Sequence, residues 1–254
     1  MTAEPQADDP EARARAWYHG IHAEFCDLIE PWEHGTVVRA TRYPDYYDLN
    51  AVRVERDPGM TAEELATFAD EALAGMAHRR IDFEDARAAE PLRKPLESLG
   101  WLTERLVWMR HDSALPPAPA VAVDDVPYDD VIDLRVGWHR EDFPTMDPGN
   151  YVAEARDAAE RRGARILAVR KGGEAVAFAQ LERHDGSAEI SQVYVHPDHR
   201  GRGLGTAITC AAIHAGSEAR DLWIIADDEG RPKELYGRLG FRPVWHTVET
   251  LRLP

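Results

Sequence analysis

The spacing of apolar residues predicts alternating helices and strands along the first hundred positions. Trp17, Ile21 and Phe25 recur at helical spacing, which predicts a helix from Glu11 to about Ile29. Thr61 and Glu64 have the spacing of a capping box and therefore predict the start of a helix. The other elements expected here are helices at 62–77 and up to residue 100, and strands at 35–41, 46–55, 81–83 and 102–110.

The second half predicts a sheet of consecutive strands followed by alternating helices and strands. Gly172-Gly173 and Asp185-Gly186 are turn dipeptides that separate three apolar stretches. The expected strands are 165–170, 175–183, 188–195, 222–226 and 242–252, and the expected helices are 128–138, 151–162, 204–215 and 232–239.

A proline-rich segment, Leu115 to Pro119, divides the two halves, because closely spaced prolines interrupt regular pairing. The pattern predicts a disordered tail at 1–10, a domain at 11–112, a linker at 113–122 and a second domain at 123–254. Leu96–Trp101 resembles Tyr236–Phe241, and each segment precedes a strand, which favours a tandem duplication with a decayed first copy.

Composition narrows the class of protein. The 254 residues include 46 acidic and 30 basic side chains, a formal charge of −16, which argues against a nucleic-acid binder. Two cysteines, Cys26 and Cys210, cannot form a disulfide framework, and neither has a neighbouring cysteine for metal binding. The chain shows no apolar run long enough for a signal core or a membrane span, so we expect a cytoplasmic protein.

The segment from Gln192 to Gly205 carries the clearest chemistry. A predicted strand enters a loop with glycine at 201, 203 and 205, and the loop opens a predicted helix. Free amide groups and the helix dipole at such a start form an anion site suited to a pyrophosphate. The segment lacks both the Gly-x-Gly-x-x-Gly dinucleotide fingerprint and the Gly-Lys-Ser/Thr of a P-loop.

Its pattern is Arg-x-x-Gly-x-Gly, as in Arg200 to Gly205, and here the chain resembles the GNAT superfamily of acyl-CoA-dependent N-acetyltransferases. The resemblance covers about residues 128–254 and implies an α+β fold with a mixed, mostly antiparallel sheet flanked by helices, in two tandem domains. It implies that Val193–Val195 splay from the neighbouring strand and pair with the pantetheine arm. The coenzyme-binding residues that it implies are Val193, Tyr194, Val195, Arg200, Gly201, Arg202, Gly203, Leu204, Gly205 and Thr206.

A second motif, Glu234 to Phe241, resembles the closing helix of the same superfamily. The resemblance implies that Tyr236 protonates the departing thiolate as a general acid. Glu189 matches the catalytic glutamate of some members, and it is either the general base or a surface residue at a strand edge. Many relatives have an asparagine ahead of the closing helix, where this chain has Asp227 to Pro232. Lys233 contacts the coenzyme phosphates or is simply solvated.

The first half lacks these features. After the predicted strand 46–55 the chain continues as Arg56 to Met60, with one glycine and an acidic residue that would oppose a phosphate. Leu96 stands where the repeat would place the catalytic tyrosine. We therefore expect a degenerate GNAT-like domain that shapes the acceptor site or replaces the partner subunit of a dimer.

The leading hypothesis is an enzyme that transfers the acetyl group of acetyl-CoA to a primary amine of a small molecule or peptide by direct attack, with no metal. The alternative is an acyl-CoA sensor or regulatory module without turnover. Neither nucleic acid nor a membrane is expected as a partner. The chain is expected to act as a monomeric pseudo-dimer or as a homodimer.

Overall fold

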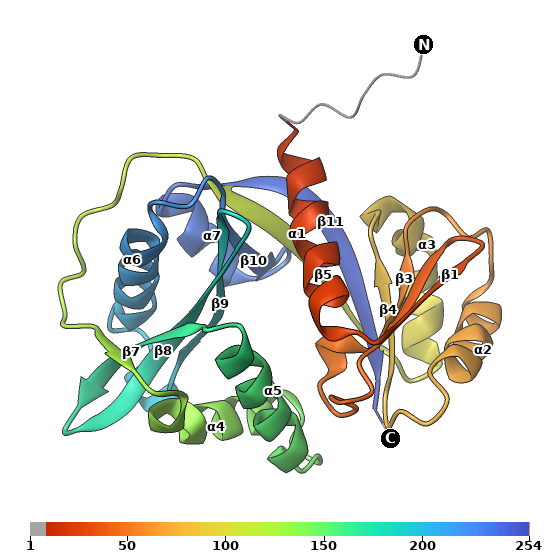
Figure 1. The fold of residues 1–254 in the computed structure, drawn as a ribbon, viewed down its shortest axis with the longest axis horizontal. Helices are drawn as coiled ribbons and strands as arrows, with labels where there is room; N and C mark the ends of the chain where they lie inside the picture. The colour runs from red at the N-terminus through yellow and green to blue at the C-terminus, as the bar shows by residue number, and fades with distance from the viewer. Residues whose placement is uncertain (1–8, 254) are drawn as a thin grey trace. The chain divides into compact units, whose positions relative to one another are not determined.

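The computed structural model describes residues 9–253 and divides into two compact units. Unit 1 comprises residues 1–108, 226–230 and 243–254, and unit 2 comprises residues 109–225 and 231–242. The helices and strands run in the order shown in Figure 1. The division at a linker over 113–122 stays a prediction about domains; the structure has no helix or strand between His111 and Asp124.

Unit 1 contains most of the elements expected in the first half. Its helices are α1 (Pro10–Phe25), α2 (Ala62–Ala72) and α3 (Ala86–Ser98), with a 3-10 turn, η1, at Tyr47–Leu49. Its strands are β1 (Leu28–Trp32), β2 (Gly35–Arg39), β3 (Ala51–Val54), β4 (Arg79–Phe83), most of β5 (Leu102–His111) and most of β11 (Phe241–Arg252). They lie in the order β1-β2-β3-β4-β11-β5. Only β3 and β4 are parallel among the strand pairs described for this unit.

The sheet of unit 1 has one apolar and one polar face. Val52 and Ile81 point into a core that includes Leu65 of α2 and Leu96 of α3. Neighbouring residues point the other way, because successive side chains of a strand alternate between faces. Asp82 accepts a hydrogen bond from Tyr18 of α1, so α1 covers the polar face.

Unit 2 holds the longer antiparallel run. Its strands are β6 (Asp124–Val126), β7 (Arg165–Lys171), β8 (Glu174–His184), β9 (Ser187–Val195) and β10 (Leu222–Asp227, of which 222–225 belong here), in the order β10-β9-β8-β7-β6. Its helices are α4 (Ile132–Asp142), α5 (Gly149–Arg161), α6 (Leu204–Gly216) and α7 (Arg231–Arg238), with 3-10 turns η2 (Tyr128–Val131) and η3 (Pro197–His199). Leu134 of α4 packs with Phe178 on one face, whereas Gly216 of α6 lies against Leu181 on the other.

The fold confirms the α+β class and the mostly antiparallel sheet. The predicted tail at 1–10 is wrong for its last two residues, because Asp9 caps α1 and Pro10 begins it; residues 1–8 lie outside the described part of the chain. The helix predicted to Ile29 ends at Phe25, because Leu28–Trp32 pairs with Gly35–Arg39 as a hairpin.

Two further differences concern short strands. The strand predicted at 46–55 is formed only over Ala51–Val54. The Asn50 side chain accepts from the Ala40 amide at 2.9 Å and donates to the Tyr43 carbonyl at 2.7 Å, which holds the preceding residues in a loop. Strand β6 was not predicted, because three residues are too few for a clear alternation. No helix in the described chain is both long enough and apolar enough to cross a bilayer.

Candidate active site in the C-terminal unit

Strand β9 separates from its parallel neighbour β10 before it ends. The pairing runs from Leu222↔Ala188 to Ile224↔Ile190, and β9 then continues for five residues to Val195. Over those residues its described partner is β8 alone, on the opposite edge. The freed edge of a strand presents N–H and C=O groups that can pair with an extended ligand.

A bulge turns the free end of β9 further. Between Phe178↔Tyr194 and Gln180↔Ser191, two residues of β9 oppose one residue of β8. Gln192 has a φ of 57°, which is uncommon outside glycine. The Arg135 guanidinium of α4 donates to the Gln192 side-chain oxygen, so a buried arginine holds the bulged residue.

The glycine-rich loop leads directly from β9 to α6. Gly201 and Gly203 have φ values of 72° and 77°, and no atom lies within 4 Å of a Cβ built at either position. Gly203 is the N-cap of α6 and has no side chain to accept the first helical amides. No acidic residue lies in the first turn. The amides of Leu204–Thr206 are therefore available to an anion.

The Arg200 side chain anchors this loop to α4. Its Nη2 lies 2.7 Å from Glu141 Oε2, and its Nε donates to the Val195 carbonyl at 2.9 Å. Tyr194 donates from its hydroxyl to the same Glu141 carboxylate, and its ring stacks on Trp138 with centroids 5.4 Å apart. Burial and the adjacent carboxylate raise the pKa of Tyr194. These side chains support the loop, and the backbone carries the edge that faces away from β8.

Tyr236 lies on α7 and is 6% exposed. Burial raises its pKa to about 12, so the phenol is protonated at neutral pH. Its ring meets Phe241 edge-on at 6.2 Å, and its hydroxyl has no hydrogen-bond partner among the described residues. Leu235, one residue earlier, lies 3.9 Å from a Cβ built on Gly205, which brings α7 against the start of α6.

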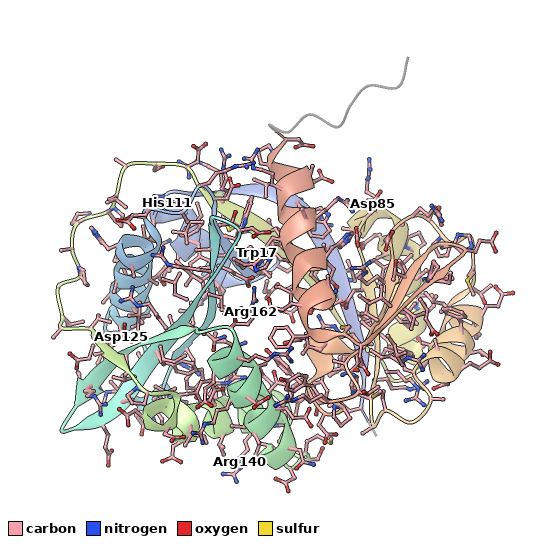
Figure 2. All side chains as sticks on the ribbon, viewed as in Figure 1. Trp17, Asp85, His111, Asp125, Arg140 and Arg162 are labelled. Atoms are coloured by element: carbon pink, nitrogen blue, oxygen red, sulfur yellow. The ribbon has the colours of Figure 1, made fainter. Side chains whose placement is uncertain are left out.

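Glu189 is buried near the start of β9, opposite Glu182 of β8 and Trp223 of β10. It is therefore not a surface residue at a strand edge. Glu182 forms an ion pair with Arg162, the residue after α5, which Figure 2 labels. No hydrogen bond joins Glu189 to Tyr236 in the described structure.

The remaining predicted coenzyme residues lie in the glycine-rich loop, in α6 and in α7. Arg202 and Thr206 are exposed and Lys233 is half-buried on α7. Sequence reasoning missed Arg135 and Gln192. Arginine and glutamine do not by themselves indicate a bulge. The register of β9 against its neighbours is needed to see that Gln192 lies in the bulge and that Arg135 holds it.

One group of potential metal ligands occurs among the described residues, and it lies in unit 1. Atoms of His19, Glu55 and Glu84 are all within 4.8 Å of one another. Glu84 already contacts Arg15 at 2.5 Å, and Glu55 contacts Arg53 at 3.0 Å. The two guanidinium groups that already contact these carboxylates would repel a metal cation there.

Comparisons with known proteins find similarity to acetyltransferases. Residues 162–243 match the family model described as "Acetyltransferase (GNAT) domain". The chain is similar to a mycothiol acetyltransferase of Thermobifida fusca, 31% identical over 228 residues that cover 86% of this chain and 62% of that protein. It is also similar to one of Saccharopolyspora erythraea, 25% identical over 95% of this chain and 63% of the relative.

A solved structure extends the likeness to the whole fold. A GCN5-related N-acetyltransferase from Kribbella flavida superimposes with a TM-score of 0.62 at 18% identity, covering 97% of this chain and 96% of the other. The chain spans between 21% and 63% of the length of the curated mycothiol acetyltransferases that it matches. The matched residues 162–243 therefore belong to the GNAT family of acetyltransferase domains.

Proposed function

We propose that the chain transfers the acetyl group of acetyl-CoA to a primary amine of a small molecule or peptide. The observation that carries the proposal is the free, bulged end of β9, which leads through η3 and the glycine-rich loop to the uncapped start of α6. Acetyl-CoA contains a pyrophosphate and an extended arm with amide groups. The uncapped start of α6 suits the pyrophosphate, and the free edge of β9 suits the arm. The curated relatives named mycothiol acetyltransferase support acetyl transfer.

The loop and the strand bind the donor in this proposal. The amides of Leu204–Thr206 and the open backbone at Gly201 and Gly203 receive the pyrophosphate. Backbone groups of Val193–Val195 pair with the pantetheine arm, and one N–H there polarises the thioester carbonyl. Arg202 and Lys233 add positive charge beside the phosphates.

Glu189 and Tyr236 manage the protons. The amine nitrogen bonds to the carbonyl carbon, the carbon–sulfur bond breaks, and the products are an amide and free CoA. Glu189 accepts the amine proton, through water where the distance requires it, and Tyr236 donates its proton to the departing thiolate. The Tyr236 phenol, with its pKa raised to about 12 by burial, carries that proton at neutral pH.

The N-terminal domain, which we place at residues 11–112, acts as a degenerate GNAT-like partner without a coenzyme site. We propose that the linker over 113–122 joins it to the catalytic domain at 123–254, so that one chain works as a pseudo-dimer. Both cysteines are free thiols, which suits a reducing cytoplasm.

Binding of acetyl-CoA to the full chain, measured by calorimetry, tests the donor site. Gly205→Asp places a negative charge among the amides of α6 and should abolish binding. Aspartate is favourable in the first turn of a helix, so the fold should be kept. Gly205→Ala is the matched control, because its Cβ meets only ordinary contacts at 3.9 Å and adds no charge.

The expected result is one bound acetyl-CoA per chain, retained by Gly205→Ala and lost in Gly205→Asp. Two bound molecules would show that the first domain is not degenerate. A chain that binds none is not an acetyl-CoA-dependent enzyme. Binding without release of a free thiol across a broad amine library would support the sensor instead.

A further inference from the structure

A small pocket lies on the polar face of unit 1, between α1 and strands β4, β5 and β11. Three aromatic rings, of Tyr18, Trp108 and Trp245, contribute to its wall. Its volume is about 10 Å³, which is room for one group the size of a water molecule or an ammonium head, and it is partly open to solvent. The two indole centroids are 5.3 Å apart, and Tyr18 meets both rings edge-on at 5.9 and 6.0 Å. The rings therefore form a continuous aromatic surface on the pocket.

Three carboxylates, of Asp82, Glu84 and Glu249, share that wall. Asp82 and Glu249 both contact the buried Arg80 at 2.8 Å, and Asp48 contacts the same guanidinium at 2.5 Å. The single Arg80 guanidinium is thus shared by three carboxyl groups. Burial and the nearby Asp82 raise the pKa of Glu249 to about 8, as expected for a carboxylate short of positive charge.

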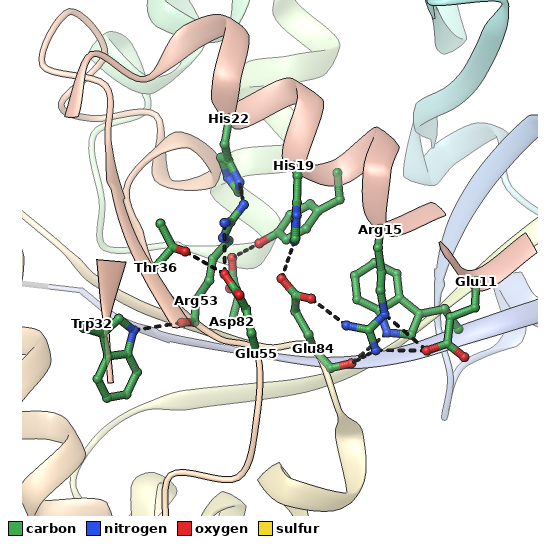
Figure 3. Close-up of polar contacts among 12 residues, drawn as sticks. Glu11, Arg15, His19, His22, Trp32, Thr36, Arg53, Glu55, Asp82 and Glu84 are labelled. Carbon is green, nitrogen blue, oxygen red and sulfur yellow. Dashed lines mark hydrogen bonds and ion pairs between the residues drawn. The ribbon is translucent and has the colours of Figure 1, made fainter. Parts of the chain in front are cut away.

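The chain already binds one of its own cations beside this pocket. The Arg15 guanidinium lies 4.6 Å from the centre of the Trp245 ring, and its Nη1 contacts Glu84 at 2.5 Å. Figure 3 shows Arg15 and His19 reaching Glu84 from α1. An aromatic face combined with a carboxylate attracts organic cations, and this combination binds the Arg15 guanidinium.

We propose that this pocket binds the terminal ammonium group of a small alkylamine. The rings attract the positive charge through their faces, and Asp82 supplies the opposite charge. Glu249, with its pKa near 8, loses its proton to solvent as the ammonium group binds beside it. An anion would be repelled by the carboxylates, and Arg80, fully engaged, does not line the space. A neutral apolar molecule would leave these carboxylates uncompensated. The inference concerns unit 1 alone and does not depend on acetyl transfer.

The test is an NMR titration of the full chain, without acetyl-CoA, that follows the indole N–H signals of Trp108 and Trp245. Butylammonium chloride is the probe, and 1-butanol and sodium butyrate are its neutral and anionic counterparts. Glu249→Gln replaces one ionisable pocket carboxyl with an amide of nearly the same size. Glu71→Gln removes an exposed charge from α2 in the same unit and serves as the matched control.

We expect saturable shifts of both signals with butylammonium and none with the counterparts. Glu249→Gln should weaken the affinity about tenfold, and Glu71→Gln should leave it unchanged. If Glu249→Gln loses its dispersed indole signals through misfolding, Asp82→Asn replaces it with the same expectation.

Three results would overturn the inference: no saturation with butylammonium, an equal response to butanol, or full affinity in a folded pocket variant. A response to zinc chloride without one to butylammonium would also overturn it, and would assign the site to His19, Glu55 and Glu84. Failure here leaves acetyl-CoA binding intact, so it is distinguishable from failure of the proposed function.

Discussion

Among the strand pairs whose register is described, two are parallel, β3–β4 in unit 1 and β9–β10 in unit 2, and they end differently. Pairing of β3 with β4 runs to their last residues, Val54↔Phe83, and continues as the Glu84 amide donates to the Val54 carbonyl at 2.9 Å. Pairing of β9 with β10 stops at Ile224↔Ile190, while β9 continues. The β3–β4 pair is therefore hydrogen-bonded to its end, whereas β9 extends past its pairing with β10 and leaves backbone groups unpaired on that side.

The helices that follow these strands differ in the same sense. At the start of α2, Thr61 accepts the Glu64 amide at 3.2 Å, and Glu64 accepts the Thr61 amide at 2.9 Å. At the start of α6, Gly203 offers no such acceptor. Similar local architecture thus leaves the start of α6 without a side-chain cap in one unit and gives α2 a capping box in the other. The difference lies in a few residues rather than in the fold.

The largest expected effect is a loss of stability of unit 1 at acidic pH. Burial lowers the pKa of His22 to about 3 and that of His78 to about 4. Both values lie below the unfolded value of 6.5, so protonation favours the unfolded chain as the pH falls below 6.5. At pH 5 each histidine should cost about 2 kcal/mol of unfolding free energy.

Urea unfolding at pH 7.5 and 5.0 measures this loss. His22→Gln and His78→Gln should each reduce the pH-dependent loss by about 2 kcal/mol. His184→Gln, at an exposed position of unit 2, is the control and should not change it. An unchanged pH dependence in both buried variants would show that these histidines do not control the acid stability of unit 1.

The second prediction concerns the role of Tyr236 of unit 2 in catalysis. Tyr236→Phe keeps the buried ring and removes the only proton that the side chain can donate. Turnover, followed by thiol release with an accepted amine, should fall ~100-fold, whereas the affinity for acetyl-CoA should stay the same. Equal turnover in the variant would remove Tyr236 from the mechanism.

The smallest effect tests whether the capped end of α2 explains the missing anion site. Thr61→Ala should lower the unfolding free energy by about 1 kcal/mol, because the cap is lost. The variant should still bind a single acetyl-CoA in calorimetry, since β3 and β4 remain paired. A second bound molecule would mean that the cap alone blocks a coenzyme site.

The sequence predicted the site better where local pattern determines structure. Thr61 with Glu64 indicated a cap, and the structure has it. Glycine at 201 and 203 permits the left-handed backbone that the loop adopts. The bulge at Gln192 depends on the register of β9 against β8, a tertiary property that residue type does not encode. The polar face of unit 1 was also missed, because its charged residues alternate with apolar ones and resemble a solvated strand face.

The division of unit 1 into three chain segments bears on the order of folding. Its strand β4 pairs with β11 from Val248↔Phe83 to Arg252↔Arg79, and β11 leaves the ribosome after all of unit 2. The N-terminal sheet therefore cannot be completed during synthesis of the first half. Until residues 243–252 emerge, β4 exposes an unpaired edge, a period in which chaperones or misfolding can compete for it.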